Sequence, residues 1–455
     1  MGIPEGVREV IDALRCAGYE AYLVGGCVRD MLLAEETGDG AFAAHDWDVC
    51  TNARPAETKR ALAPRKTLDT GLKHGTLTVL MPDGQYEVTT YRVDGSYSDG
   101  RHPDSVRFTP SLTEDLSRRD FTVNAMAMAP GAGGAPPEVI DPFGGRDDLR
   151  RRLLRCVGDP DTRFGEDALR ILRAVRFASR FGLTVEPGTH EAMLHNRALL
   201  GRVSAERVFS ELSGILVTER GGEYLHAYAD ILTEIIPELA PCVGFEQRNP
   251  WHCRDVFDHI MLSVASAPPE LTIRLTMLLH DIGKPAAASV DEVGVGHFYG
   301  HQKLSAEIAE TVLRRLRCPN RLLRDVTELV RCHDAAVEPT EQSLRRLLNR
   351  LGAEQARRLL AVKRADAMAQ SEKARGRIAE LTRSEALLER IIAERQAFSL
   401  KDLAIDGNDL IARGVAPGPE LGRRLRLALD AVLDGRAENE REALLAVACA
   451  EDAAL

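Results

Sequence analysis

The sequence predicts an α+β fold, in which a mixed sheet with helices near the N-terminus is followed by an all-helical remainder. Between residues 20 and 91, short runs of strand type alternate with helical stretches and glycine turns. From residue 149 onward, apolar residues recur at helical spacing, and we expect helices to the end. The chain has 455 residues, a length that suits about two to four domains.

The composition, 44% hydrophobic and 28% charged residues, is that of a soluble globular protein. No segment approaches the roughly 18 consecutive apolar residues of a membrane span. The first residues lack the apolar core of a signal peptide. Nine cysteines without a Cys-x-x-Cys pair argue against a disulfide framework or a zinc ribbon. We therefore expect a cytoplasmic protein without a membrane partner.

The basic residues are unevenly distributed along a chain whose net charge is −10. That charge alone argues against a nucleic-acid partner. However, Arg supplies 51 of the 59 basic residues, and thirteen Arg with no Lys lie between Arg146 and Arg207. Arg suits bidentate contacts to phosphates and bases, and local patches decide such binding. For any single Arg, a solvated helix face is the alternative interpretation.

The elements of the first part follow from local patterns. Val7, Val10, Ile11 and Leu14 repeat at helical spacing and predict the first helix. Pro82-Asp83-Gly84 is a typical hairpin turn. In order, we expect a helix at 4–20, a strand at 22–24, a helix at 29–33, a polar loop at 35–44, a strand at 47–51, a helix at 55–63, and strands at 75–81 and 85–91.

Two acids one residue apart, Asp46 and Asp48, lie on an expected strand. Side chains alternate across a strand, so both point to one face about 7 Å apart. Mg²⁺ binds through one or two carboxylates plus substrate phosphates. Gly25 and Gly26 let the backbone approach a phosphate, and the helix start after them favours anions. The pattern predicts a nucleotidyl-transfer site; Glu87 is a candidate third carboxylate or an ordinary strand glutamate.

Residues 92–107 form a polar stretch rich in Gly and Pro that is too long for a plain turn. Such loops are usually functional lids or disordered segments. After it, a helix is expected to open at Glu114 and to continue past Asn124. Arg118 and Arg119 near the glycine pair could hold a triphosphate, or serve only for capping and surface charge. Residues 131–137 are a Gly/Ala/Pro linker.

A second informative stretch begins at residue 165. Asp167, Arg170, Arg173 and Arg176 are three apart, so successive pairs share one face of the expected helix. Such a ladder can simply be helix-stabilising salt bridges. Alternatively, a carboxylate can accept from the exocyclic amine of a base while Arg donates to a ring acceptor. This pair could accept CTP and ATP and reject UTP and GTP, because a wrong base leaves buried polar groups unpaired.

Together these motifs resemble the class II tRNA nucleotidyltransferase and poly(A) polymerase family, in its bacterial type. The resemblance runs in order over residues 20–212 and implies a polymerase-β-like nucleotidyltransferase head, a helical neck, and addition of the 3′-terminal CCA to tRNA from CTP and then ATP, with no role for DNA. The matching segments are Gly25-Gly26-Cys27-Val28-Arg29-Asp30, Asp46-Trp47-Asp48, Arg118-Arg119-Asp120-Phe121-Thr122-Val123-Asn124, Glu166-Asp167 through Phe177, and 202–207.

The family's residue roles can be carried over to the matching positions. By resemblance, Asp46 and Asp48 would bind Mg²⁺, and Asp167 and Arg170 would read the base. Nucleotide contacts would come from the glycine and arginine motifs, and phosphate contacts or support from the later arginines. The residues implied in these last two roles are Gly25, Gly26, Arg29, Arg119, Asp120, Arg173 and Arg176. The loop at 94–103 matches a segment that members adding the terminal A possess. Poly(A) polymerases and enzymes adding only A share these motifs.

A second group of metal-ligating residues lies downstream. An adjacent His-Asp after an apolar helical run can place both side chains at one metal. The pattern resembles the HD phosphohydrolase superfamily, which implies phosphomonoester or cyclic phosphodiester hydrolysis with a divalent transition metal such as Mn, Ni or Fe. The alternatives are packed core histidines or a retained fold with weak turnover. The implied primary ligands are His259, His280, Asp281 and Asp366, and His301 and His333 could serve a second metal.

Four domains are expected on these resemblances: a nucleotidyltransferase head at 1–148, a neck at 149–240, an HD-type body at 241–372, and a helical tail at 373–455 that would bind tRNA. Two readings from other classes compete. The chain could chiefly be an HD phosphohydrolase acting on RNA ends, or a noncatalytic RNA-binding protein. The intact acid pair and the complete base-reading stretch argue against the first, and the two complete sets of metal-ligating residues argue against the second.

Overall fold

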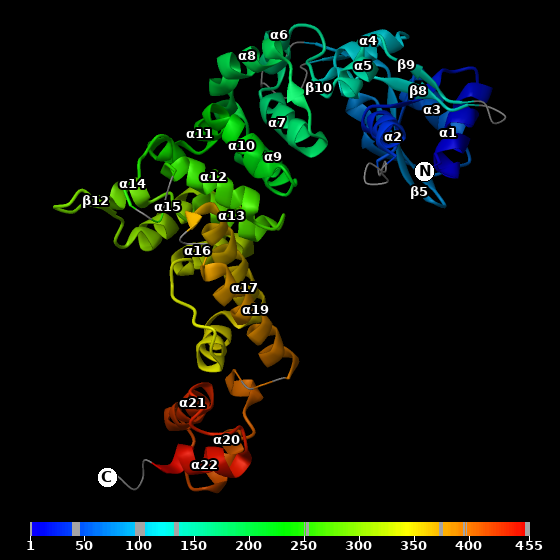
Figure 1. Ribbon diagram of the computed structural model, residues 1–455. Helices are drawn as coiled ribbons and strands as arrows, with labels where there is room; N and C mark the ends of the chain where they lie inside the picture. Colours follow the sequence, from blue (N-terminus) through cyan, green and yellow to red (C-terminus); the bar gives the residue numbers. More distant parts are fainter. Residues whose placement is uncertain are drawn as a thin grey trace. The chain divides into compact units, whose positions relative to one another are not determined.

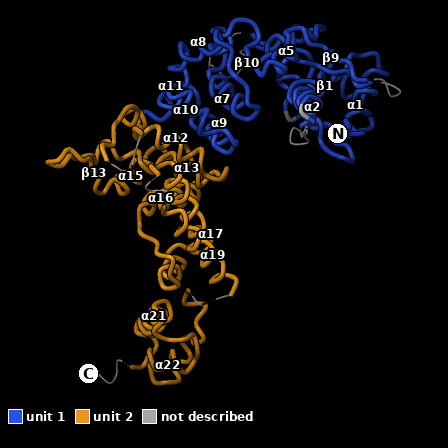
Figure 2. Tube along the Cα trace, viewed as in Figure 1, with its two compact units in different colours: residues 1–237 blue, residues 238–455 orange. Residues whose placement is uncertain are grey.

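A computed structural model describes residues 2–38, 46–95, 105–131, 136–249, 251, 254–372, 376–394, 396 and 398–450. The chain divides into two compact units, residues 1–237 and 238–455 (Figure 2). The described cysteines are free thiols. Among the described residues, no helix combines the length and apolar character needed to span a membrane.

The first unit is built on a seven-stranded mixed sheet of order β3-β4-β5-β2-β1-β8-β9 (Figure 1). Only β2 and β5 pair in parallel; the other neighbours are antiparallel. The strands are β1 (Ala21–Val24), β2 (Asp48–Thr51), β3 (Thr67–Gly71), β4 (Thr76–Met81), β5 (Gly84–Thr90), β8 (Ala127–Ala129) and β9 (Glu138–Ile140), with a separate hairpin of β6 (Arg92–Asp94) and β7 (Val106–Phe108). The α+β prediction is confirmed.

The helices around this sheet pack through their apolar faces. The predicted face of α1 is fully buried, and the helix packs against α3 and β1. It ends at Cys16 instead of residue 20, because Gly18 has a φ of 87° that a helix does not accommodate. The helices of this part are α1 (Glu5–Cys16), α2 (Gly26–Thr37), α3 (Pro55–Leu62), α4 (Leu112–Ser117) and α5 (Gly145–Arg150).

The long helix expected from Glu114 past Asn124 is wrong. Helix α4 ends at Ser117, a short 3-10 turn follows at Thr122–Asn124, and the chain becomes strand β8. The reason is burial: Phe121 is fully buried, and its ring packs edge-on against Phe177 at 5.9 Å. Strands β3, β8 and β9 and the β6–β7 hairpin were not anticipated. Most of the loops expected at 35–44, 94–103 and 131–137 lies outside the described residues.

The rest of the first unit is helical, as expected, apart from the two-residue parallel pair β10 and β11. Helix α7 packs against α9 and α10, and α6 packs against α8. These elements are β10 (Leu153–Leu154), α6 (Pro160–Glu166), α7 (Leu169–Phe181), β11 (Thr184–Val185), α8 (Pro187–Asn196), α9 (Ala205–Leu216), α10 (Gly221–Ala227) and α11 (Ala229–Ile235).

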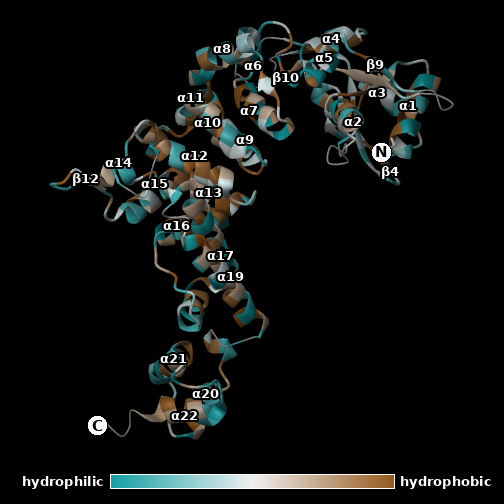
Figure 3. Ribbon diagram, in the orientation of Figure 1, coloured by the Kyte–Doolittle hydropathy of each residue, from teal (hydrophilic) through white to brown (hydrophobic). Residues whose placement is uncertain are grey.

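The described residues of the second unit form helices and one short hairpin, and hydrophobic stretches mark α12 and α13 (Figure 3). Helix α17 is interrupted at Gly352, whose φ of 75° is not helical. Helices α20 to α22 enclose a hydrophobic cluster of their own. The elements are α12 (Val256–Ser266), α13 (Leu271–Leu279), α14 (Lys284–Ala287), β12 (Ser289–Val290), β13 (Gly296–His297), α15 (His301–Arg315), α16 (Asn320–Cys332), α17 (Glu341–Ala369), α19 (Arg377–Ala393), α20 (Gly407–Ala412), α21 (Pro419–Leu433) and α22 (Arg441–Cys449).

Candidate active site and metal cluster

The glycine turn between β1 and α2 brings a backbone loop against an arginine. Gly25 has a φ of 78°, which L side chains rarely adopt. A Cβ at Gly25 would lie 3.0 Å from Nη1 of Arg119. The Nε of Arg119 is buried without a hydrogen-bond partner among the described residues. Gly26 begins α2, and no side chain caps this helix start. The N-terminus of α2 and the Arg119 guanidinium therefore lie beside the same turn.

Three carboxylates meet beside this turn. Asp48 begins β2 and is in register with Glu87 on the parallel strand β5. Asp46 lies two residues before Asp48, outside the strand. Burial raises the pKa of Asp48 to about 6; Arg119 opposes this shift, while Glu87 and Asp46 add to it. Such a concentration of carboxylate oxygen is the chemistry that a hard divalent cation fits.

Arg119 is held by Asp115, a residue that the sequence interpretation did not single out. Asp115 on α4 is 1% exposed. Arg118 Nη2 donates to it at 2.8 Å and Arg119 Nη2 at 3.4 Å. Although burial raises the pKa of Asp115, the two guanidinium groups outweigh it and lower that pKa. Arg118 also contacts Asp94 at the end of β6, at 3.4 Å.

Arg29 is not placed as expected. We expected it to contact a nucleotide, but it is 4% exposed and donates to Asp30 and to Asn124. Its guanidinium also lies over the Phe181 ring at 4.2 Å. Asn124 in turn donates to Asp120 at 3.1 Å. Buried polar groups require such partners, so Arg29 here joins the head to α7.

Asp120 is also part of this internal network. Arg173 donates to it twice, at 2.9 and 2.7 Å. Burial raises the pKa of Asp120, but Arg173 and Asn124 outweigh it and lower the pKa to about 2. Asp120 therefore serves to orient the Arg173 side chain.

The expected base-reading pair lies at a break between two helices. Asp167 has an extended backbone between α6 and α7, so it is not on the same helix as Arg170, contrary to expectation. Its Oδ1 accepts from the Leu169 N–H at 3.1 Å, and its Oδ2 accepts from Arg207 at 2.7 Å. Arg170 donates to Glu166 and to the Arg118 carbonyl oxygen, at 3.3 Å for the latter. Both side chains have a fixed orientation.

The arginines of α7 diverge instead of forming one row. Arg173 faces Asp120, whereas Arg176 donates to Glu211 on α9 at 2.5 Å. Positions three apart are rotated by about 60°, so Arg170 and Arg176 are about 120° apart around the helix. Arg176 thus stabilises the packing of α7 on α9, and its expected phosphate contact is not supported by its position. Arg207 and Glu211 were missed as partners, although 202–207 was recognised as a motif.

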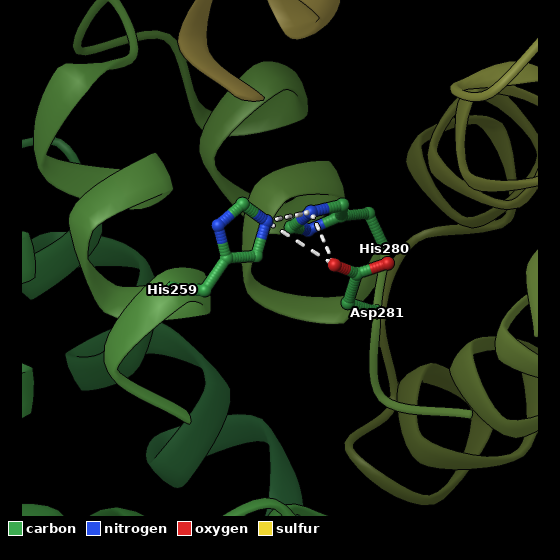
Figure 4. A group of neighbouring side chains, drawn as sticks. All are labelled: His259, His280 and Asp281. Carbon is green, nitrogen blue, oxygen red and sulfur yellow. Dashed lines mark hydrogen bonds and ion pairs between the residues drawn. The ribbon is translucent and has the colours of Figure 1, made fainter. Parts of the chain in front are cut away.

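The six predicted residues of the second unit converge around Asp281. Figure 4 shows three of them, His259, His280 and Asp281. One carboxylate oxygen, Oδ2, lies 3.2 Å from Nε2 of both His259 and His280. The other, Oδ1, lies 3.3 Å from Nε2 of His301 and 3.6 Å from Nε2 of His333. Asp366 completes the first group, with Oδ1 3.0 Å from Nε2 of His259. We call these six residues the His–Asp cluster.

The backbone fixes the tautomer of three of the four imidazoles. The Nδ1 of His280, His301 and His333 donates to carbonyl oxygens at 2.7, 2.8 and 2.7 Å. A carbonyl can only accept, so the proton of each neutral ring is on Nδ1 and the Nε2 lone pair faces the cluster. The Nε2 atoms of His301 and His333 are 3.3 Å apart. Two lone pairs at that distance need a cation or a proton between them, as expected of metal-ligating histidines.

The electrostatics of the His–Asp cluster also favour a cation or a proton between these side chains. Burial lowers the pKa of His280, but Asp281 and Asp366 outweigh it and raise the pKa to about 10. The cluster therefore attracts positive charge. Lys284 supplies some of it: its Nζ lies 2.7 Å from Asp281 Oδ2 and donates to Gln247 Oε1 at 2.9 Å. Neither Lys284 nor Gln247 was predicted, although Lys284 follows the His-Asp pair by three positions.

The chain matches three family models: the poly A polymerase head domain over residues 21–155, the RNA and SrmB-binding site of polymerase A over 182–242, and the tRNA nucleotidyltransferase domain 2 over 297–448. A CCA-adding enzyme of Lactobacillus delbrueckii is 34% identical over 435 residues, which are 96% of this chain and 95% of that protein. The chain belongs to the CCA-adding enzyme family.

Other CCA-adding enzymes agree in length and fold. That of Lactiplantibacillus plantarum is 33% identical over 97% of this chain and 95% of its own. The solved structure of the Bacillus stearothermophilus CCA-adding enzyme in complex with CTP is 29% identical, with a TM-score of 0.71 over 99% of this chain and 97% of that chain. The resemblance to this family is thereby confirmed. The stretch from Asp167 to Arg176 lies between the first two matched regions.

Proposed function

We propose that this member of the CCA-adding enzyme family adds the 3′-terminal CCA to tRNA, using CTP and ATP and no nucleic-acid template. The observation that carries the proposal is the meeting of Asp46, Asp48 and Glu87 beside Arg119 in the same unit as the oriented Asp167–Arg170 pair. The first group suits transfer of a nucleotide, and the second suits recognition of its base.

In this reaction the 3′-hydroxyl oxygen of tRNA bonds to the α-phosphorus, the bond to the bridging oxygen breaks, and pyrophosphate leaves. Asp46 and Asp48 would hold Mg²⁺, with Glu87 beside them; when bound, the metal supplies charge neutralisation at the phosphates and acidifies the attacking hydroxyl. Arg119, held by Asp115, would bind the triphosphate over the glycine turn.

Asp167 and Arg170 would read the base. Cytosine and adenine both present an amine donor beside a ring-nitrogen acceptor, which a carboxylate and a guanidinium can pair with. Arg207 and Glu166 hold the two readers in place, and the buried Asp120–Arg173 pair fixes α7 against the head. Pre-orientation of this kind makes discrimination stronger, because a mismatched base leaves both groups unpaired.

Incubation with single nucleotides tests the function. The substrates are tRNA transcripts ending before, within and after CCA. We expect CTP alone to extend the first until both C residues are present, and ATP alone to extend only the transcript ending in CC. Transcripts with a complete CCA should not grow. Extension by ATP of a transcript that lacks CC would instead indicate an A-adding or poly(A) enzyme.

The raised pKa of Asp48 predicts how Mg²⁺ binding depends on pH. Burial favours the neutral acid and raises the pKa to about 6. Mg²⁺ needs the carboxylate, so below pH 6 it must displace a proton, and its affinity should fall by up to about tenfold per pH unit. Calorimetric titration of the full chain between pH 5 and 7.5 measures this. In Asp48→Asn the pH dependence should vanish; an unchanged profile would contradict the assignment.

We keep the fourfold division of the chain as part of the proposal: head 1–148, neck 149–240, body 241–372 and tail 373–455. Two features support it. The seven-stranded sheet ends with β9 at Ile140, and the three tail helices enclose their own hydrophobic cluster. The head would carry the chemistry and the neck the base readers, while the tail would bind tRNA.

A second function is favoured by the His–Asp cluster: metal-dependent hydrolysis of phosphoesters. The supporting observation is that His301 and His333 direct Nε2 lone pairs at each other across 3.3 Å, with Asp281 facing both. Imidazole and carboxylate ligands together suit transition metals such as Mn, Ni or Fe. His259, His280, Asp281 and Asp366 would hold one ion, and Asp281 with His301 and His333 a second.

Metal binding by the full chain tests this second function. We expect Mn²⁺ or Ni²⁺ to bind tightly, and Asp281→Asn to weaken binding by at least about 100-fold, since even outer partners of metal ligands contribute about 10- to 100-fold. Asp325→Asn is the matched control; this half-buried aspartate lies on α16 near arginines. If both variants bind metal like the parent chain, the cluster is not a metal site.

A further inference from the structure

Two cavities meet at the His–Asp cluster. The first has a volume of about 580 Å³ and the second about 440 Å³. Each lies within the roughly 300–1,000 Å³ of a small-ligand site. They share four lining residues: His333, Asp334, Asp366 and Gln370. Two of these belong to the cluster, so a phosphate at the cluster can have a substituent in either cavity.

The first cavity has aromatic walls. Tyr299 is 80% exposed, and its ring stacks on His297 with centroids 5.3 Å apart and planes 7° from parallel. Trp251, 37% exposed, also lines this cavity, with the Arg377 guanidinium over its ring at 5.2 Å. His297 is the last residue of β13, and Tyr299 lies two positions after it and two positions before His301 of the cluster. Exposed flat rings of this kind suit the stacking of a nucleobase.

The second cavity has different walls. Its lining combines two cations with four carboxylates and several small or apolar side chains. The cations are Lys363 and Arg377, and the carboxylates are Asp334, Glu338, Asp366 and Glu380. Nζ of Lys363 donates to the His333 carbonyl oxygen at 2.8 Å, so this ammonium lies beside the cluster. Lys363 lies on the side of the scissile phosphate, and the carboxylates of this cavity can accept hydrogen bonds from the hydroxyl groups of a sugar that continues from it. A mononucleotide or a cyclic phosphodiester would leave this second cavity empty.

We propose that the His–Asp cluster acts on a linear phosphodiester of a single-stranded oligonucleotide, with one nucleoside in each cavity. This rests on the hydrolase function proposed above and specifies its substrate. In the reaction, a water oxygen bonds to phosphorus, the P–O bond to one nucleoside breaks, and that oxygen leaves with a proton from the water. The products are a nucleotide with a terminal phosphate and a nucleoside with a free hydroxyl.

The test compares a substrate with two nucleosides and one with none, on the full chain with Mn²⁺ and no nucleoside triphosphate. The dinucleotide CpA and its deoxy form report on both cavities, and p-nitrophenyl phosphate, whose single ring needs only one cavity, reports on the cluster without the second cavity. Ala336→Trp fills the second cavity from an exposed position, and Ala336→Ser is its matched control. Tyr299→Ala removes the ring from the first cavity.

We expect Ala336→Trp and Tyr299→Ala each to lower kcat/KM for CpA about tenfold or more, with hydrolysis of p-nitrophenyl phosphate changed less than about twofold in Ala336→Trp. Calorimetry with a non-hydrolysable phosphorothioate dinucleotide should show the same loss of affinity, independent of turnover. Equal effects on both substrates, or none on the dinucleotide, would overturn the proposal while leaving the hydrolase intact. Absence of hydrolysis of both CpA and p-nitrophenyl phosphate by the parent chain would overturn both.

Discussion

Asp48→Ala is expected to reduce incorporation of CTP and ATP into tRNA by about 10³-fold or more. Metal stabilisation of transition-state charge contributes several kcal/mol, and each ~1.4 kcal/mol is tenfold in rate. Asp46→Ala should have a similar effect, because the two acids would hold the same ion. Glu87→Gln, at the position paired with Asp48, should show whether the third carboxylate shares this role. Single-turnover incorporation of labelled nucleotide measures all three.

Asp69→Ala is the matched control for these variants. It removes an aspartate from strand β3 of the same sheet, where the side chain is 51% exposed and pairs with Lys59. Exposed ion pairs contribute little, about 0–1 kcal/mol, so incorporation should stay within about twofold. If Asp46→Ala and Asp48→Ala both retain incorporation, the assignment of the transferase site is wrong.

Asp167→Ala is expected to relax the choice of nucleotide more than it slows transfer. A bidentate side-chain pair contributes about 1–3 kcal/mol of discrimination between bases, so the preference for CTP and ATP over UTP and GTP should fall about 10- to 100-fold. Part of this loss would arise because Arg207 loses its hydrogen-bond partner, so that the side chains of the site are no longer held in one orientation. Competition among all four nucleotides on one tRNA transcript measures the ratio.

An aspartate on α6 provides a matched control for Asp167→Ala. Asp161 is 53% exposed and pairs with His195, away from the contacts of Asp167. Asp161→Ala should leave the ratio among the nucleotides unchanged. Unaltered discrimination in Asp167→Ala would mean that the base is read elsewhere, and would remove the reason for assigning Arg170 the second role.

Local sequence was sufficient to recognise candidate site residues that lie close together in the chain. The acids at 46 and 48, the glycine turn, and the His–Asp pair at 280 and 281 could be recognised because each motif is contiguous. The expected ligands from separate helices, at 259, 301, 333 and 366, were predicted by resemblance. The three histidines converge on Asp281, and Asp366 lies beside His259. Their distances could not be known, since they depend on the packing of four helices.

Sequence patterns were insufficient where tertiary contacts decide an orientation. Arg29 was expected at a nucleotide, and Arg173 and Arg176 either at a phosphate or in a supporting role. In the structure, each is bonded to a protein carboxylate or amide. The pattern predicts an arginine face and cannot tell which buried acid lies opposite it. In the same way, Phe121 ends the expected helix because its ring packs on α7, a contact made across more than fifty residues of chain.

The composition of the extended 3′ end tests the central claim most directly. A tRNA transcript that ends before CCA is incubated with the full chain, CTP and ATP, and the product is analysed by intact mass spectrometry. We expect a single product whose added mass is that of C, C and A in sequence, with no growth after the A. A ladder of A residues, addition of A alone, or incorporation of U or G from a mixture of all four nucleotides would contradict it.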